Sequence, residues 1–189
     1  MTNLNYENQR LVDIVNEDDE IIDAKTRTEA HRTGLLHREI HVWMRDKGRN
    51  IIFQRRGLDR QSAGLLDATV GGHVNKGEDY LSAAIRETKE ETGISINASD
   101  LVLLKKLRGS EIAKNPFGSK NNFIRAVYFY KQPVHSEDIK KEAGIPGGGF
   151  QKFAIDFFLN PKEEHISSLL PFVFKEELPL VLEHMKNDI

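Results

Sequence analysis

The sequence has no cysteine among its 189 residues. The absence of thiols excludes disulfides, a thiolate nucleophile, cysteine-ligated zinc and iron–sulfur clusters. Long apolar runs are also lacking, because none approaches the roughly 20 residues that a membrane-spanning helix needs. Residues 1–7 show no basic segment followed by an apolar core, so no secretory signal is expected. These absences favour a cytoplasmic protein with no membrane partner.

An excess of charge of one sign is missing too, because 27 Lys and Arg residues stand against 29 Asp and Glu residues, a formal net charge of −2. This balance favours neither a nucleic acid nor an anionic membrane as partner. Hydrophobic residues make up 39% and charged residues 30% of the chain, which is typical of a folded globular protein. We therefore expect a single domain over residues 1–189.

Alternation of apolar and polar residues predicts several strands. Residues 11–15 and 20–24 flank an acidic turn, which predicts a hairpin in an N-terminal extension, about residues 1–36, packed on the rest of the chain. Residues 38–45 alternate and continue through a turn into a strand at 50–55. Elements interleave without a strict βαβ rhythm, which predicts a mixed α/β or α+β fold. Further strands are expected at 101–107, 123–130 and 150–157, and further helices at 136–142 and 175–186.

The clearest helix is predicted over residues 79–92. Asp79 is suited to the N-cap of this helix, and Gly93 to the left-handed position that ends it. Apolar or small side chains recur with the spacing of one helical face, at Leu81, Ala84, Ile85 and Thr88.

Three glutamates project from one polar side of this helix, because Glu87, Glu90 and Glu91 lie at positions i, i+3 and i+4. Like charges at this spacing repel each other by a few tenths of a kcal/mol per pair. A solvated helix surface tolerates that repulsion, and a bound cation removes it. Hard divalent cations such as Mg2+ prefer oxygen ligands, so the pattern indicates either a solvated face or a metal site.

A longer pattern decides between these two alternatives. The residues from Gly72 to Ile94 resemble the Nudix box, G-x5-E-x7-R-E-U-x-E-E-x-G-U, in which U is a bulky aliphatic residue. Eight of the nine defined positions match, and the exception is Thr88. A match of this length favours the Nudix hydrolase family.

That resemblance implies an α/β/α sandwich with a mixed β-sheet. It implies hydrolysis of the diphosphate linkage of a nucleoside diphosphate derivative or a related organic diphosphate, by attack of water at phosphorus with Mg2+ or Mn2+ as cofactor. It also implies the roles within the box: metal ligation by Glu87, Glu90, Glu91 and the Gly72 carbonyl, catalysis by the same glutamates and Arg86, and structural support by Glu78 and Gly93.

Basic residues near the box are candidates for substrate binding. Arg55 and Arg56 lie at the end of a predicted strand, and Lys76 lies within the box loop. Guanidinium groups hold phosphate at two points, so we expect these residues to bind the diphosphate of a small-molecule substrate. A solvated basic loop is the alternative. The sequence leaves the choice between a monomer and a homodimer open.

The segments 16–31, 37–45 and 51–56 look like those of the Nudix branch that includes isopentenyl-diphosphate isomerase. As that branch performs the isomerisation, it uses a cysteine just before the histidine that corresponds to His73, and this chain has none. The missing acid–base partner disfavours isomerisation. A non-catalytic Nudix module that binds a nucleotide is a further alternative, but such a module has no need of the three glutamates.

His31, His37 and His73 lie roughly where the isomerases hold a histidine-rich metal site. That site also uses two closely spaced glutamates on a later strand, and residues 123–130 contain no glutamate. Lone histidines are more often hydrogen-bonded structural residues. The sequence therefore leaves open whether these three histidines bind a metal.

Overall fold

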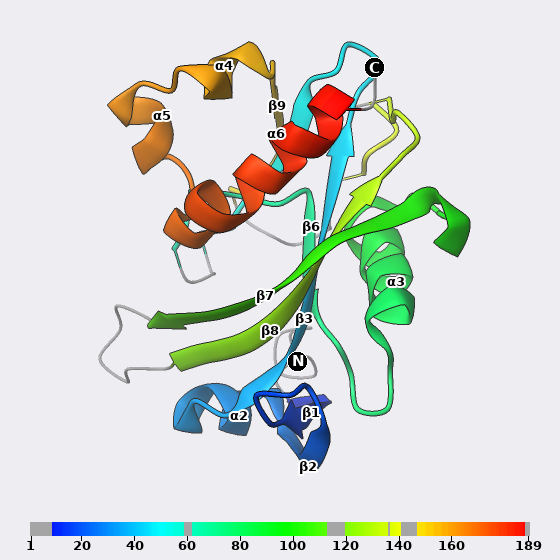
Figure 1. Cartoon of the computed structure of the whole chain (residues 1–189), viewed down its shortest axis with the longest axis vertical. Helices are drawn as coiled ribbons and strands as arrows, with labels where there is room; N and C mark the ends of the chain where they lie inside the picture. Colours follow the sequence, from blue (N-terminus) through cyan, green and yellow to red (C-terminus); the bar gives the residue numbers. More distant parts are fainter. Residues whose placement is uncertain (1–8, 59–61, 113–119, 136, 141–146, 188–189) are drawn as a thin grey trace.

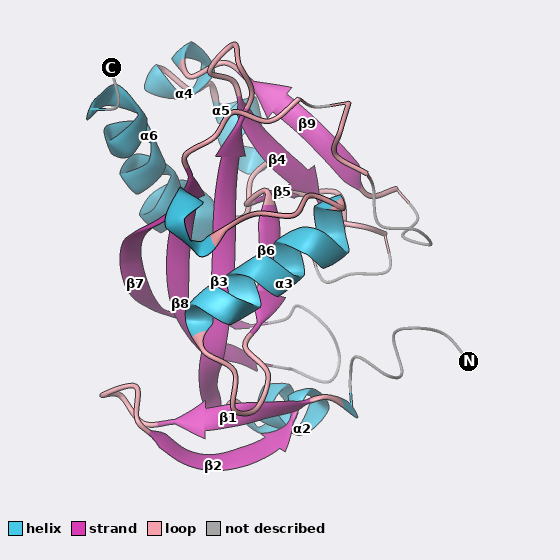
Figure 2. Cartoon of the chain, turned by 90° about the vertical axis from the view of Figure 1, so that its right-hand side faces the viewer, coloured by secondary structure: helices cyan, strands magenta, loops and turns pink. Residues whose placement is uncertain are grey.

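A mixed sheet with helices on both faces forms the molecule (Figure 1 and Figure 2). Nine strands belong to this sheet, and the predicted α/β/α sandwich is confirmed. Within the described part of the chain, no helix is both long and apolar enough to cross a membrane. The computed structural model describes residues 9–58, 62–112, 120–135, 137–140 and 147–187.

The N-terminal segment contains the two strands that the sequence predicts. β1 (Leu11–Val15) pairs antiparallel with β2 (Ile21–Thr26). α2 (Arg27–Thr33) follows directly, with Thr26 as its N-cap and Gly34, at φ 68°, as its left-handed end. This helix was not predicted, because its short polar sequence carries no apolar stripe.

β3 (Leu36–Arg45) lies at the centre of the sheet. It pairs antiparallel with β1, with β4 (Ile51–Arg55) and with β6 (Val70–His73). It pairs in parallel with β8 (Lys120–Tyr130), and this one parallel pair makes the sheet mixed. Residues 36–43 of β3 therefore lie beside a strand from a distant part of the chain, and its last two residues pair with β4, the next strand in the sequence.

The remaining strands extend the sheet on both sides. β7 (Leu101–Ile112) pairs antiparallel with β8. β5 (Leu66–Asp67) and β9 (Gly149–Phe153) both pair with β4. β5 and β6 were not predicted, because two and four residues are too few to show a clear alternation.

Two helices cover opposite faces of the sheet (Figure 1). α3 (Tyr80–Thr92) packs on a core that includes Ile40 and Val42 of β3. α6 (Leu178–Asn187) packs on a second core that includes Trp43 of the same strand. Successive residues of a strand point to opposite faces, so β3 contributes to both cores.

Some predicted elements differ from the structure. The strand predicted at 150–157 ends at Phe153. Of the helix predicted at 136–142, residues 137–138 form a turn and residues 139–140 are irregular, with Ile139 buried, and the other residues of that prediction lie outside the described residues. The helix predicted at 175–186 begins earlier, in the π-helical turn η2 (Val173–Glu177), and continues as α6. The unpredicted short helices are η1 (Ala98–Asp100), α4 (Asp156–Leu159) and α5 (Glu163–Ser167).

A buried ionic network joins the sheet to the C-terminal helices. Arg125 of β8 donates through Nε and Nη2 to Glu39 Oε2, at 3.1 and 2.7 Å, and through Nη1 to Glu177 Oε1 at 2.8 Å. Glu177 Oε2 also accepts from His41 Nδ1 at 2.8 Å and from Trp43 Nε1 at 3.1 Å. All five residues are buried, so protein partners replace water around each polar group.

The carboxylate of Glu177 is stabilised by this network. Burial by itself raises the pKa of Glu177, but the neighbouring His41 and Arg125 outweigh burial and lower the pKa from 4.5 to about 2. A carboxylate with a lowered pKa in the folded state stabilises the fold above its unfolded pKa, and this contribution disappears as the pH falls towards the folded pKa. The contribution of Glu177 is therefore complete at neutral pH and lost between pH 4.5 and about 2.

We expect Glu177→Gln to lower the free energy of unfolding at neutral pH by about 3–5 kcal/mol, the usual cost of breaking a buried ion pair. Since the variant lacks the titrating carboxylate, its difference from the unmodified protein should shrink as the pH falls below 4.5. Urea unfolding across this pH range measures the difference. Glu176→Gln, at the exposed neighbouring position, is the control. A difference that does not change with pH would contradict this account of Glu177.

Candidate active site

The local sequence builds α3 as predicted. The Asp79 side chain accepts a hydrogen bond from the Ser82 amide at 2.7 Å and so caps the helix. Gly93 ends it at φ 76°, and its N–H donates to the Lys89 carbonyl at 3.0 Å. Thr88 is buried, and its Oγ1 has no hydrogen-bond partner among the described residues. The departure from the box pattern thus places a hydroxyl in a core position.

Arg86 holds the acidic side of α3 together. Its Nε and Nη2 donate to the two oxygens of Glu78, at 2.9 and 2.8 Å. Its Nη1 donates to Glu87 Oε1 at 2.7 Å and to Glu90 Oε2 at 3.2 Å, and Nη2 also donates to the His73 carbonyl at 2.9 Å. Burial by itself lowers the pKa of Arg86, but the neighbouring carboxylates of Glu78 and Glu87 outweigh burial and raise the pKa above its usual value. Arg86 therefore stays charged and orients the glutamates.

Two box glutamates lie against the backbone of β6. A Cβ added to Gly72 would stand 2.2 Å from Cδ of Glu87, so the Glu87 side chain occupies space that only glycine leaves open. Glu91 Oε2 accepts hydrogen bonds from the Gly71 amide at 3.2 Å and from Gln54 Nε2 at 3.1 Å. The contact between Gln54 and Glu91 was not predicted, because it joins β4 to α3, two elements that are separated in the sequence.

These box groups fit a hard divalent cation in their chemistry. Glu87, Glu90, Glu91 and the Gly72 carbonyl offer only oxygen, which suits Mg2+ or Mn2+. The cradle at Gly72 agrees with this fit, since a side chain there would displace Glu87. Among the described residues, however, the one group of three or more His, Asp or Glu ligand atoms that lies close together is outside the box. In the structure, Arg86 supplies the positive charge that Glu87 and Glu90 share.

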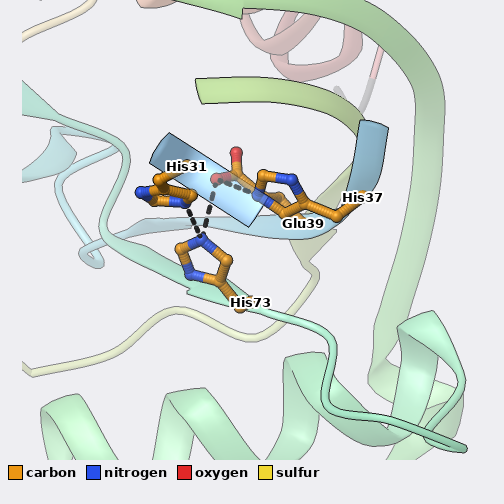
Figure 3. Close-up of side chains that lie close together, drawn as sticks. All are labelled: His31, His37, Glu39 and His73. Carbon is orange, nitrogen blue, oxygen red and sulfur yellow. Dashed lines mark hydrogen bonds and ion pairs between the residues drawn. The ribbon is translucent and has the colours of Figure 1, made fainter. Parts of the chain in front are cut away.

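The compact group consists of His31, His37, Glu39 and His73 (Figure 3). His31 belongs to α2, His37 and Glu39 to β3, and His73 to β6. One ligand atom of each residue lies within 4.8 Å of the others. The structure thus brings together the three histidines that the sequence leaves open. It adds Glu39, which sequence reasoning missed although it follows His37 by two positions and therefore shares its strand face.

The protonation states in this cluster follow from burial and charge. Burial lowers the pKa of His31 to about 4, and it also lowers the pKa of His37 and His73. Burial alone raises the pKa of Glu39, but the guanidinium group of Arg125 holds it well below its usual range. At neutral pH the cluster therefore combines three neutral imidazoles with one carboxylate.

Of the candidates for substrate binding, the two arginines have hydrogen-bond partners within the protein. Arg55 donates to the Gly64 carbonyl at 2.7 Å and to a β9 side chain. Arg56 donates to Asp67 Oδ2 at 2.5 Å. Lys76 is exposed in the loop between β6 and α3. Both guanidinium groups are thus held by hydrogen bonds within the protein.

Comparison of the sequence with known proteins agrees with the resemblance of residues 72–94 to the Nudix box. Residues 35–165 match the NUDIX domain family. A Nudix hydrolase of Streptomyces coelicolor, described as uncharacterised, is 40% identical over 86 residues, which cover 45% of this chain and 48% of that protein. A Nudix hydrolase of Clostridium acetobutylicum, also described as uncharacterised, is 28% identical over 157 residues, 78% of this chain and 71% of that protein. The chain thus spans about half the length of the first relative.

Solved structures resemble this fold over most of the chain. A protein of Deinococcus radiodurans superposes with a TM-score of 0.65 at 22% identity, covering 92% of this chain and 98% of that chain. The MutT protein of Methanosarcina mazei superposes with a TM-score of 0.57 at 18% identity, covering 81% of this chain and 94% of that chain. At these identities the likeness concerns the fold alone.

The contact between Gly72 and Glu87 predicts a double-mutant result. Gly72→Ala should lower the free energy of unfolding by about 1–3 kcal/mol, because the new methyl group overlaps Cδ and Cγ of Glu87. Glu87→Ala removes those atoms, so adding Gly72→Ala to this variant should cost much less. Urea unfolding of both single variants and the double variant measures the coupling. An equal cost of Gly72→Ala in both backgrounds would disprove the close contact.

Proposed function

This chain belongs to the Nudix family, and we propose that it hydrolyses the diphosphate linkage of a nucleoside diphosphate derivative or a related organic diphosphate. Water attacks phosphorus, and the linkage breaks to release the two phosphorylated products. The observation that carries the proposal is the complete set of box contacts around Arg86, together with the glycine cradle for Glu87. A solvated acidic surface would need neither the hydrogen bonds to Arg86 nor the open space at Gly72.

The box glutamates and the Gly72 carbonyl are the proposed ligands of Mg2+ or Mn2+. Such an ion would neutralise the charge that develops on the diphosphate during hydrolysis. Glu78 fixes Arg86, and Arg86 orients Glu87 and Glu90. The Gly71 amide and Gln54 hold Glu91. These contacts support a site whose carboxylates are oriented before the substrate binds.

Arg55, Arg56 and Lys76 are the proposed contacts of the substrate diphosphate. Arg56 is paired with Asp67, and a diphosphate carries more negative charge than one carboxylate. The substrate can therefore compete for this guanidinium group and bind it at two points. Lys76 is exposed near the start of α3, where a flexible ammonium group can follow the phosphates.

We propose one Nudix domain over residues 1–189, with residues 1–36 as an extension packed on it. β1 pairs with β3 and α2 follows the hairpin, which supports this division. The cysteine-free sequence supports a cytoplasmic enzyme with a small-molecule substrate. Neither a nucleic acid nor a membrane is part of the proposal, and a homodimer is the oligomeric state to be tested by sedimentation.

The rival activities receive less support. An isomerase of the related branch needs a cysteine just before His73, where this chain has Gly71 and Gly72. A Cβ at Gly71 would lie 2.9 Å from His41 Nε2, so any side chain at this position would have to displace that ring. A non-catalytic binding module would not need the acidic side of α3 and its contacts with Arg86.

Hydrolysis of a panel of nucleotide and prenyl diphosphates with Mg2+ or Mn2+ tests the proposal. We expect turnover of at least one compound, and a loss of several orders of magnitude in kcat/KM for Glu90→Gln and for Glu91→Gln, because each removes a charged ligand. Glu183→Gln, on the exposed surface of α6, is the matched control. Nucleotide binding without turnover of any compound would instead identify a binding module.

A further inference from the structure

We propose that Arg10 binds a phosphate group of the diphosphate substrate beside Glu90, so that the N-terminal segment completes the active site. Arg10 directly precedes β1. It lies outside residues 35–165, the part of the chain that matches the family, and outside the box. The inference rests on the proposed hydrolysis and adds to that site a substrate-binding residue from a different part of the chain.

The side chain of Arg10 reaches the acidic side of α3. Its Nη1 lies 3.9 Å from Glu90 Oε2. The same oxygen accepts a hydrogen bond from Arg86 Nη1 at 3.2 Å. The side chain of Arg10 is 28% exposed and that of Glu90 is 45% exposed, so a small ligand can reach both from solvent. Two guanidinium groups from different parts of the chain thus flank one box carboxylate.

The backbone of Arg10 is held at the open end of the N-terminal hairpin. Its carbonyl accepts a hydrogen bond from the Arg27 N–H at 2.9 Å. The next residue, Leu11, pairs with Thr26 of β2. A side chain on a fixed backbone loses less freedom when it binds a ligand than a side chain on a mobile loop does. Arg10 is therefore oriented toward the box before a substrate arrives.

β1 also holds the loop between β6 and α3, which runs past this strand (Figure 2). The Lys76 N–H donates to the Leu11 carbonyl at 2.9 Å, and the Gly77 N–H donates to Asp13 Oδ2 at 2.8 Å. The Asp13 carboxylate is buried, so this contact is shielded from water. The same strand thus fixes the loop of Lys76, a proposed phosphate contact, and the backbone of Arg10.

The two guanidinium groups beside Glu90 are not held equally. Arg86 also donates to Glu78 and Glu87, whereas the 3.9 Å contact of Arg10 with Glu90 is longer than a hydrogen bond. Arg10 is therefore the cation that leaves Glu90 more readily when this carboxylate ligates a divalent ion. A phosphate group beside that carboxylate offers Arg10 oxygens that a guanidinium group binds at two points. Arg10 exchanges a carboxylate for a phosphate.

Binding of Mn2+ and of inorganic diphosphate to the full chain tests the proposal without turnover. We expect Arg10→Ala to bind Mn2+ about two- to fivefold more tightly, because a cation that competes for Glu90 is removed. With saturating Mg2+, the same variant should bind inorganic diphosphate at least about 10-fold more weakly, because a charged hydrogen-bond donor is lost. Electron paramagnetic resonance measures free Mn2+, and calorimetry measures diphosphate binding.

Further variants separate the charge of Arg10 from its geometry. Arg10→Lys keeps the charge but not the two-point hold, so it should keep the Mn2+ affinity of the unmodified chain and recover only part of the diphosphate affinity. Arg32→Ala, at an exposed position on α2 of the same segment, is the matched control and should change neither affinity. With a substrate identified from the panel, Arg10→Ala should raise KM about 10-fold and change kcat less.

Two results would overturn the proposal. One is an unchanged diphosphate affinity in Arg10→Ala. The other is weaker binding of both Mn2+ and diphosphate in this variant, which would mean that Arg10 only supports the fold of the segment. The proposed hydrolysis is judged separately, because a chain that shows the two opposite shifts but turns over no diphosphate contradicts only the hydrolysis. A chain that hydrolyses a diphosphate with the same KM in Arg10→Ala contradicts only the role of Arg10.

Discussion

The guanidinium group of Arg125 is buried, and two carboxylates from distant parts of the chain have to reach it. Glu39 comes from the centre of β3, and Glu177 comes from the π-helical turn that precedes α6. A buried charge that loses one partner costs several kcal/mol, so the sheet and the C-terminal helices depend on each other. The same interaction turns Glu39 Oε1 toward the histidines. One buried arginine therefore links the stability of the fold to the arrangement of Glu39 beside the histidines.

Among the box residues, Arg86 is the positive charge that several carboxylates share, as Arg125 is in the buried network. It holds Glu78, Glu87 and Glu90 by direct hydrogen bonds and connects them to the His73 carbonyl. Without a positive charge, carboxylates at this spacing would repel each other. A divalent cation bound here would take over part of the neutralisation that Arg86 supplies. The acidic side of α3 is thus ordered by charge and not by an apolar contact, which keeps its carboxylates accessible to small ions.

Local features of the sequence predicted the box helix well, because the Asp79 cap, the Gly93 end and the apolar stripe all act within a few residues. The hairpin strands were predicted for similar reasons, whereas the α/β/α sandwich was implied by the resemblance of residues 72–94 to the Nudix box. Other features depend on contacts between remote segments. The four-residue strand β6 is too short for periodicity to identify, and α2 has no apolar stripe. The spacing of two positions puts Glu39 on the same strand face as His37, but the sequence did not show that His73 pairs opposite Glu39 in the sheet.

Glu39 and Arg125 are 86 residues apart in the sequence, yet they lie side by side on parallel strands. Pairing over such a separation is slow, because a long loop loses its freedom before the contacts compensate for the loss. The box helix lies inside that loop, and its cap and end need only neighbouring residues. We therefore expect the glutamates to acquire their helix before Glu39 acquires its orientation, which requires β3 and β8 to meet. The two acidic groups of the molecule thus differ in kind, because one is organised by neighbours in the sequence and the other by the closure of a long loop.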